Sequence, residues 1–344
     1  MACARFTLAM ALVGALSGQP MHSQAIRPRA AKISTAGASA SSASSPRPGL
    51  RVPILGLVDS GPTKPELRPI LGFARFPSLG PPLPLPTGTS HVFLAPSQDY
   101  ALTICDGVLG TLPLADGEVG EWSTVAGDIP FPDRVAFSPS GKAAALYSVS
   151  RQRVQILEGL PNAVRVLNEF DTAGLPARVT ALAVSDDAKL LLTGVSDGES
   201  GGVYALSRDG SPALVARAGN PSAIRVLADT RTAAFADGAW NQIVLLEDSS
   251  FGRGYRIIAS ATHGVSHPSD LGFSNDGRRI VVANSGSNTF LSIDLKETNP
   301  AAVSCAFTPL RVIRLATTIA LTSADQASLC MLETGTSKVL QVGR

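Results

Sequence analysis

The sequence has few charged side chains, few aromatic side chains and only four histidines. Charged residues make up 16% of the chain, and 29 Lys and Arg nearly balance 27 Asp and Glu. This balance excludes the strongly basic surface on which nucleic-acid binding depends. Hydrophobic residues, in contrast, make up 44% of the chain, which excludes wholesale disorder. With 32 glycines and 25 prolines, the composition indicates short strands joined by turns.

The N-terminal residues have the three parts of a signal peptide. Arg5 supplies a positive charge, residues 6–16 are uncharged and too short to cross a bilayer, and Ser23 and Ala25 are the small residues that a signal peptidase reads. We expect cleavage after Ala25 and a secreted or periplasmic protein with no integral membrane segment. An uncleaved anchor or a buried helix is the alternative. Cys3 precedes the apolar stretch, which argues against a lipoprotein.

Composition also divides the rest of the chain. Residues 26–50 are rich in Ala, Ser, Pro and Arg, and residues 51–88 are rich in proline, with one strand expected around 68–73. We therefore expect a signal peptide at 1–25, a disordered or irregular linker at 26–65 and a folded domain at 66–344.

A short motif recurs from about residue 89 onward. An apolar strand, a polar turn that begins with serine and a basic residue follow one another at 135–142, 182–189 and 271–278. With three weaker copies, the residues before the six turns are 43, 47, 43, 46 and 42 positions apart. A period of this length, filled by four short strands, predicts an all-β protein folded as a β-propeller. In the second unit the strands are expected at 134–138, 143–150, 153–157 and 163–170.

The number of blades depends on the use of residues 51–88. The repeats alone give six four-stranded blades. A seventh blade exists if this segment forms a degenerate one. Alternatively, the segment supplies one strand that completes the last blade and closes the ring. No helix is expected after the signal peptide, because no long stretch carries an apolar stripe at helical spacing.

The fifth unit, residues 267–294, resembles the YVTN-type β-propeller repeat of exported bacterial proteins. The namesake tetrapeptide is replaced by VVAN at 281–284. The other residues at positions that this repeat carries are Pro268, Gly277, Asn288 and Asp294. The resemblance implies a propeller of the lactonase-like and WD-like superfamily, which includes hydrolases, redox enzymes and interaction scaffolds. The Trp-Asp pairs of WD-type repeats are missing from the sequence.

Charged residues stand near the start of several expected inner strands, two positions after a proline. The predicted site at the channel mouth consists of Arg134, Arg178, Arg311, Asp270 and His267. The three arginines together would bind a small anion such as a carboxylate or a phosphate. Asp270 would pair with one of them, and His267 would face the channel as an acid or base. The alternative is that these residues are solvated strand ends or ion pairs between blades.

Motifs for catalysis, metal binding or cofactor binding do not accompany this site. His263 and His267 are four residues apart but lie in a loop rather than a helix. We therefore expect no cofactor, no catalytic residue and a monomer that serves as a non-enzymatic scaffold for an unknown protein or a small anion. The alternative is a lactonase-like hydrolase with an axial metal, so enzymatic activity stays open. Its candidate ligands are His267, Asp270, Asp133 and Asn220.

Three cysteines remain after the expected cleavage, namely Cys105, Cys305 and Cys330. Their spacing matches no zinc or haem motif. An exported protein permits one disulfide, but the sequence does not select a pair, and the thiols are interpreted first as small buried apolar groups.

Overall fold

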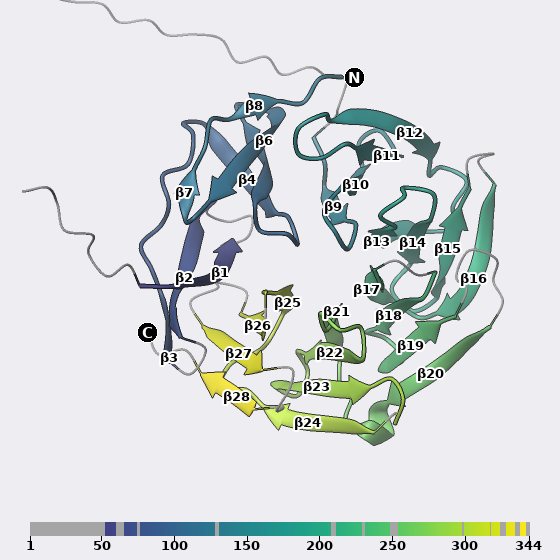
Figure 1. Ribbon diagram of the computed structural model, residues 1–344. Helices are drawn as coiled ribbons and strands as arrows, with labels where there is room; N and C mark the ends of the chain where they lie inside the picture. Colours follow the sequence, from purple (N-terminus) through teal and green to yellow (C-terminus); the bar gives the residue numbers. More distant parts are fainter. Residues whose placement is uncertain are drawn as a thin grey trace, which may run out of the picture. The chain divides into compact units, whose positions relative to one another are not determined.

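The strands in the described part of this chain form seven antiparallel sheets arranged in a ring (Figure 1). The computed structural model describes residues 52–59, 65–73, 76–127, 131–207, 211–228, 231–247, 254–297, 299–316, 318–323, 328–333 and 338–341. The expected signal peptide and the expected linker up to residue 51 lie outside the described residues. Among those that are described, the one helical element is the 3-10 turn η1 (Ala261–His263).

Each sheet is a blade, and the blades are numbered here in chain order. Blade 1 contains β1 (Ile54–Asp59), β2 (Leu67–Phe73) and β3 (Phe76–Leu79). Blade 2 contains β4 (Thr89–Leu94), β5 (Tyr100–Cys105), β6 (Val108–Ala115), β7 (Glu118–Val119) and β8 (Ser123–Thr124). Blade 3 contains β9 (Arg134–Phe137), β10 (Ala143–Ser148), β11 (Arg153–Glu158) and β12 (Arg165–Asp171). Blade 4 contains β13 (Arg178–Val184), β14 (Leu191–Ser196), β15 (Gly201–Leu206) and β16 (Pro212–Ala218).

The three C-terminal blades follow the same order. Blade 5 contains β17 (Pro221–Val226), β18 (Ala233–Asp237), β19 (Gln242–Leu246) and β20 (Tyr255–Ser260). Blade 6 contains β21 (Pro268–Phe273), β22 (Arg279–Asn284), β23 (Thr289–Asp294) and β24 (Pro300–Ser304). Blade 7 contains β25 (Arg311–Arg314), β26 (Thr318–Thr322), β27 (Leu329–Glu333) and β28 (Lys338–Gln341). The first strand of each blade lies nearest the centre of the ring (Figure 1).

The predicted propeller is confirmed, and of the two blade counts seven is the correct one. The repeat count missed blade 1, which is built from the proline-rich segment. The alternative use of that segment, as a single strand added to the last blade, is wrong, because β1, β2 and β3 pair with one another and β25 to β28 form a sheet of their own. Since β1 begins at Ile54, the ring also begins before residue 66, where composition placed the domain boundary.

The serine of the repeated motif explains why the turn recurs. Each serine is buried, and its hydroxyl accepts a backbone N–H five residues later, at or just before the start of the following strand. This bond joins Ser138 to the N–H of Ala143 (3.1 Å) and Ser274 to the N–H of Arg279 (3.0 Å). A serine that bonds the backbone close by favours a turn over a continued strand. The pattern is local, and it is therefore visible in the sequence.

Hydroxyl groups also form hydrogen bonds between neighbouring blades, close to the start of the inner strands. Ser222 at the start of β17 donates to the carbonyl of Pro268 in blade 6 (2.6 Å), and Ser269 in blade 6 donates to the carbonyl of Pro309 before blade 7 (3.2 Å). Thr180 makes the same bond from blade 4 to Pro221 (2.7 Å). Three of the prolines that align the loops in the sequence thus accept a hydrogen bond from the preceding blade.

The hydrophobic core lies between adjacent blades. Each main cluster of buried side chains takes residues from two neighbouring sheets, for example Ile156 of β11 with Val195 of β14. Second strands such as β10 and β18 are buried along their whole length and are rich in alanine, because the sheets crowd together toward the ring axis.

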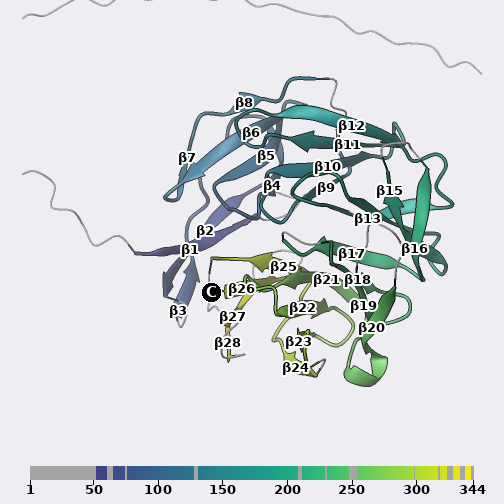
Figure 2. The same ribbon diagram turned by 45° about the vertical axis from the view of Figure 1, so that its right-hand side comes forward.

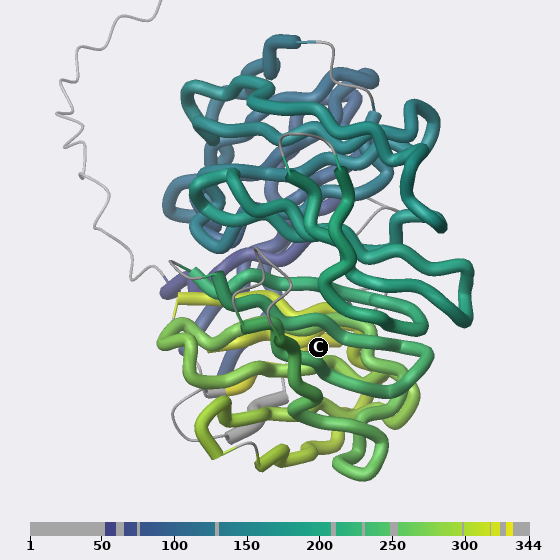
Figure 3. The backbone as a smooth tube through the Cα atoms, turned by 90° about the vertical axis from the view of Figure 1, so that its right-hand side faces the viewer, coloured from purple at the N-terminus to yellow at the C-terminus, as the bar shows by residue number. Residues whose placement is uncertain are grey.

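Blade 1 differs from the others in the direction of its inner strand. Asp59 at the end of β1 contacts Arg311 at the start of β25, whereas a side chain at Gly56 would meet Leu315, which follows the end of β25. β1 therefore runs opposite to β25. Blades 1 and 7 lie side by side in all three views, where purple meets yellow (Figures 1, 2 and 3).

Side chains close the ring between blades 7 and 1, since none of the described strands is shared between the two sheets. The side-chain amide of Gln98, in the turn between β4 and β5, forms with the backbone of β1 the kind of hydrogen bonds that a neighbouring strand would form. It accepts from the N–H of Leu57 (2.8 Å), donates to the carbonyl of Leu57 (3.4 Å) and donates to the carbonyl of Arg314 (3.3 Å). One side chain of blade 2 thus joins blade 1 to blade 7.

Candidate binding site at the top mouth of the channel

The channel along the ring axis has two ends, and each end has a cavity. We call the end at which β9, β13, β17, β21 and β25 begin the top mouth, and the end at which they finish the bottom mouth. A cavity of about 210 Å³ lies at the top mouth and is lined by Arg134, Arg225, Asp270 and Arg311 among others. Of the five residues predicted for this site, Arg134, Asp270 and Arg311 line the cavity, whereas Arg178 and His267 do not.

Arg311 forms an ion pair that joins blade 7 to blade 1. Its Nη1 and Nη2 donate to the two carboxylate oxygens of Asp59, with 3.1 Å between Nη2 and Oδ2. The Asp59 side chain is only 3% exposed. Burial alone would lower the pKa of the Arg311 guanidinium, but the charge and hydrogen bonds of Asp59 outweigh it and raise that pKa. Arg311 is therefore neutralised within the protein.

Asp270 is also held within the protein, by a partner that the sequence did not suggest. Its Oδ1 accepts from Nη2 of Arg225 on β17 (2.7 Å) and its Oδ2 accepts from the N–H of Val312 on β25 (2.9 Å). Because Asp270 belongs to β21, one buried carboxylate ties blades 5, 6 and 7 together. The guanidinium that donates to Asp270 is that of Arg225, so the prediction that Asp270 pairs with one of the three predicted arginines is wrong.

Arg134 and Arg178 are the two predicted arginines that no carboxylate neutralises by a direct bond. They begin β9 and β13 and are exposed at the rim of the top mouth. Desolvation has the largest effect on the pKa of Arg134 and lowers it, and the positive charge of Arg178 lowers it further. Tyr147 and Asp133 raise this pKa, but by less. Within the described part of the chain, neither guanidinium donates a hydrogen bond to a carboxylate. Two like charges are thus held near each other beside the cavity.

His267 lies away from the predicted position. It precedes β21 in a left-handed backbone conformation (φ 42°), and its side chain is exposed. Its backbone N–H donates to Oδ1 of Asn241 (2.6 Å), which fixes the loop. His267 lines neither the top cavity nor the cavity at the bottom mouth.

The candidate metal ligands are similarly dispersed. The carboxylate of Asp133 accepts from the N–H of Val149 (2.7 Å), and that of Asp270 is bound to Arg225. Among the residues that the structure describes, no three His, Cys, Asp or Glu side chains are gathered as a metal site would require. A search of the same residues for a helix long and apolar enough to cross a membrane finds none.

Comparison with known proteins supports the fold and gives no family. No protein-family model matches the chain, and no curated protein matches its sequence. Among solved structures, the WD40 repeats of RRP9 are similar with a TM-score of 0.54 and 13% identity, over 76% of this chain and 81% of that one. A chain in the crystal structure of a nidogen/laminin complex is similar with a TM-score of 0.48 and 14% identity, over 72% and 92%. At this identity, the likeness to RRP9 shows the β-propeller fold alone.

Proposed function

We propose that this chain is an exported β-propeller that serves as a non-enzymatic binding scaffold and holds a small anion at the top mouth. The observation that carries the proposal is the pair Arg134 and Arg178. Their charges repel one another, and an anionic group between them would remove that repulsion while accepting charge-assisted hydrogen bonds. A carboxylate or phosphate fits the planar donor arrangement of guanidinium groups. The resemblance of residues 267–294 to the YVTN-type repeat supports the export of the protein.

The R134A/R178A double variant should bind anions much more weakly than the wild type. Hydrogen bonds to charged groups contribute about 1.5–3 kcal/mol each, so the loss of both guanidinium groups should weaken binding at least about a hundredfold. Inorganic phosphate and citrate serve as the probes in isothermal titration calorimetry at low salt. The binding should also weaken as the salt concentration rises, because both arginines are exposed.

The matched control is the R153A/R165A variant. These two arginines lie on the outer strands of blade 3, where each pairs with a glutamate, Arg153 with Glu169 and Arg165 with Glu158. Their removal changes the net charge by the same amount as the test variant does. Equal binding by the wild type and R134A/R178A would refute the site, and so would equal weakening by the two double variants.

Export leads to a second prediction, a disulfide between Cys305 and Cys330. Cys305 follows β24 and packs against the cluster that contains Cys330 of β27. A hydrogen bond between the two thiols lowers the pKa of Cys305. In an oxidising compartment the two thiols lose two protons and two electrons to a small disulfide such as oxidised glutathione, which is reduced to two thiols.

Thiol titration of the denatured mature protein measures this disulfide. After incubation with oxidised glutathione, Cys105 should be the one cysteine that still reacts, and the protein should lose the mass of two hydrogen atoms. The C105S variant should lose the same mass, and C305S should not. If Cys305 and Cys330 both still react after incubation, the disulfide does not form.

A further inference from the structure

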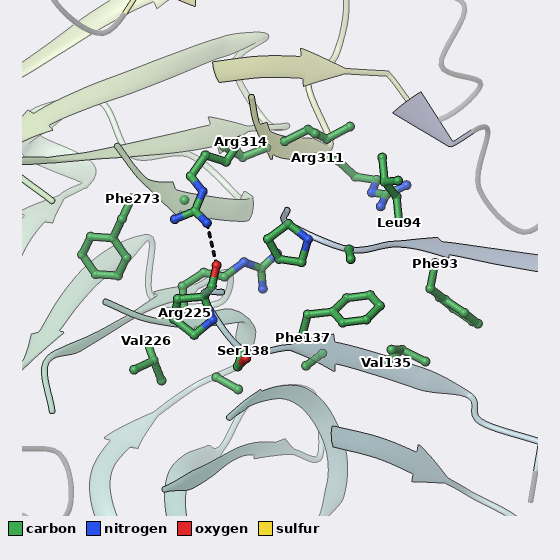
Figure 4. A pocket seen from close by; sticks show the side chains of 18 of the residues that line it. Phe93, Leu94, Val135, Phe137, Ser138, Arg225, Val226, Phe273, Arg311 and Arg314 are labelled. Carbon is green, nitrogen blue, oxygen red and sulfur yellow. Dashed lines mark hydrogen bonds between the residues drawn. The ribbon is translucent and has the colours of Figure 1, made fainter. Parts of the chain in front are cut away.

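The channel has a second cavity, at the bottom mouth, with a volume of about 220 Å³. Figure 4 shows apolar side chains around it, among them Phe93 of β4, Phe137 of β9 and Phe273 of β21. Arg134 and Arg178 do not line it. The two cavities share part of the channel wall, including Val135, Arg225 and Arg311. The three phenylalanines and Arg314 line the bottom cavity and not the top one, and this apolar wall favours a ligand with an apolar body.

Three arginines reach this apolar cavity, and two of them are neutralised. Arg225 pairs with Asp270, and Arg311 pairs with Asp59. The third is Arg314 at the end of β25, which is half-buried. Its Nη2 donates to the carbonyl of Pro139 (2.5 Å), the bond drawn as a dashed line in Figure 4. Within the described residues, no carboxylate bonds to Arg314.

The position of Arg314 leaves one positive charge without an anion inside the cavity. A guanidinium has five N–H donors, and a single neutral carbonyl uses one of them. A charge that is partly withdrawn from water and faces apolar groups gains most from a bound anion with matching geometry. Because the excess is one charge, the cavity suits a ligand with one carboxylate.

The size of the cavity limits the rest of the ligand. Pockets for drug-sized molecules measure about 300–1,000 Å³, so this cavity suits a smaller molecule. The three phenylalanines and the valines Val135 and Val226 offer contacts to a ring or a short branched chain. We propose that the bottom cavity binds a small organic monocarboxylate with an aromatic or branched apolar body, and that Arg314 is its carboxylate-binding residue.

Benzoate is the probe for this site, and benzamide is its uncharged isostere. Calorimetry on the wild-type protein should show one benzoate bound per chain, with benzamide at least about tenfold weaker because it lacks the charge-assisted bonds. The R314Q variant should bind benzoate at least about tenfold more weakly than the wild type. The affinity of R314K should lie between those of R314Q and the wild type, because lysine keeps the positive charge but lacks the paired N–H donors of a guanidinium. The top-mouth variant R134A/R178A should bind benzoate like the wild type.

A second variant keeps the test valid if R314Q does not fold, since Arg314 also bonds Pro139. V135F leaves Arg314 in place and fills part of the cavity from β9, so it should exclude benzoate while its circular dichroism stays that of the wild type. The proposal is wrong if the wild type does not bind benzoate with a Kd of about 1 mM or tighter. It is also wrong if folded R314Q and V135F both bind benzoate as the wild type does. Phosphate binding at the top mouth is measured separately, so either site can fail without the other.

Discussion

The D270A variant should lose about 3 kcal/mol of its free energy of unfolding, more than we expect for any single substitution at the ring closure. The carboxylate is buried and accepts from Arg225, from the N–H of Val312 and from the N–H of Leu271 (2.9 Å). Its removal leaves backbone N–H groups without an acceptor and a guanidinium without a counter-charge. The estimate lies at the low end for buried ion pairs because the Arg225 side chain is 41% exposed.

Urea denaturation followed by circular dichroism measures this loss. The control is E247A, because Glu247 also pairs with an arginine, Arg256 at 3.0 Å, but is 61% exposed. Exposed pairs contribute about 0–1 kcal/mol, so the control should remain close to the wild type. If D270A is no less stable than E247A, the carboxylate does not hold blades 5, 6 and 7 together.

The second large effect concerns ring closure. R311Q should lose about 2 kcal/mol, because it leaves the buried Asp59 carboxylate without its main counter-charge while Arg311 itself is partly exposed. The loss should be smaller when Asp59 is also replaced, since D59N/R311Q no longer buries a charge. A double-mutant cycle should therefore give a coupling energy of about 1–2 kcal/mol between the two positions.

The same urea titrations of D59N, R311Q and the double variant give this coupling. Blades 1 and 7 share no described strand, so side chains such as this pair and Gln98 must hold the two blades together. If the two single effects simply add, Asp59 and Arg311 do not stabilise one another, and ring closure rests on other contacts.

The sequence predicts the parts of the fold that local chemistry determines. Ser138 and Ser274 bond backbone groups five residues away, so each of the three clear copies carries its own turn and the strands around it can be placed to within a few residues. Blade 1 carries no copy of the repeated motif in its sequence. It is held by contacts between distant residues, such as Gln98 with Leu57 and Arg311 with Asp59, and its prolines resemble a linker. The sequence therefore indicates only the strand around 68–73 and leaves the seventh blade as one of two alternatives.

The candidate site, like the fold, could be predicted from the sequence only in part. The loop prolines predict that Arg134 and Arg178 begin neighbouring strands, and the structure places these residues side by side at one mouth. The pairing of Asp270 with Arg225 was missed because Arg225 lies within β17 rather than in a loop. An arginine between Ile224 and Val226 in an apolar strand was the available signal, since a charge in such a position needs a partner.

The most direct test of the proposed function is to locate a bound anion at the top mouth. Selenate resembles phosphate in shape and charge, and its selenium gives an anomalous signal in crystals soaked at low salt. We predict an anomalous difference peak within hydrogen-bonding distance of the guanidinium groups of both Arg134 and Arg178, and no peak there in crystals of R134A/R178A. A fully soaked wild-type crystal without a peak between these two arginines would contradict it.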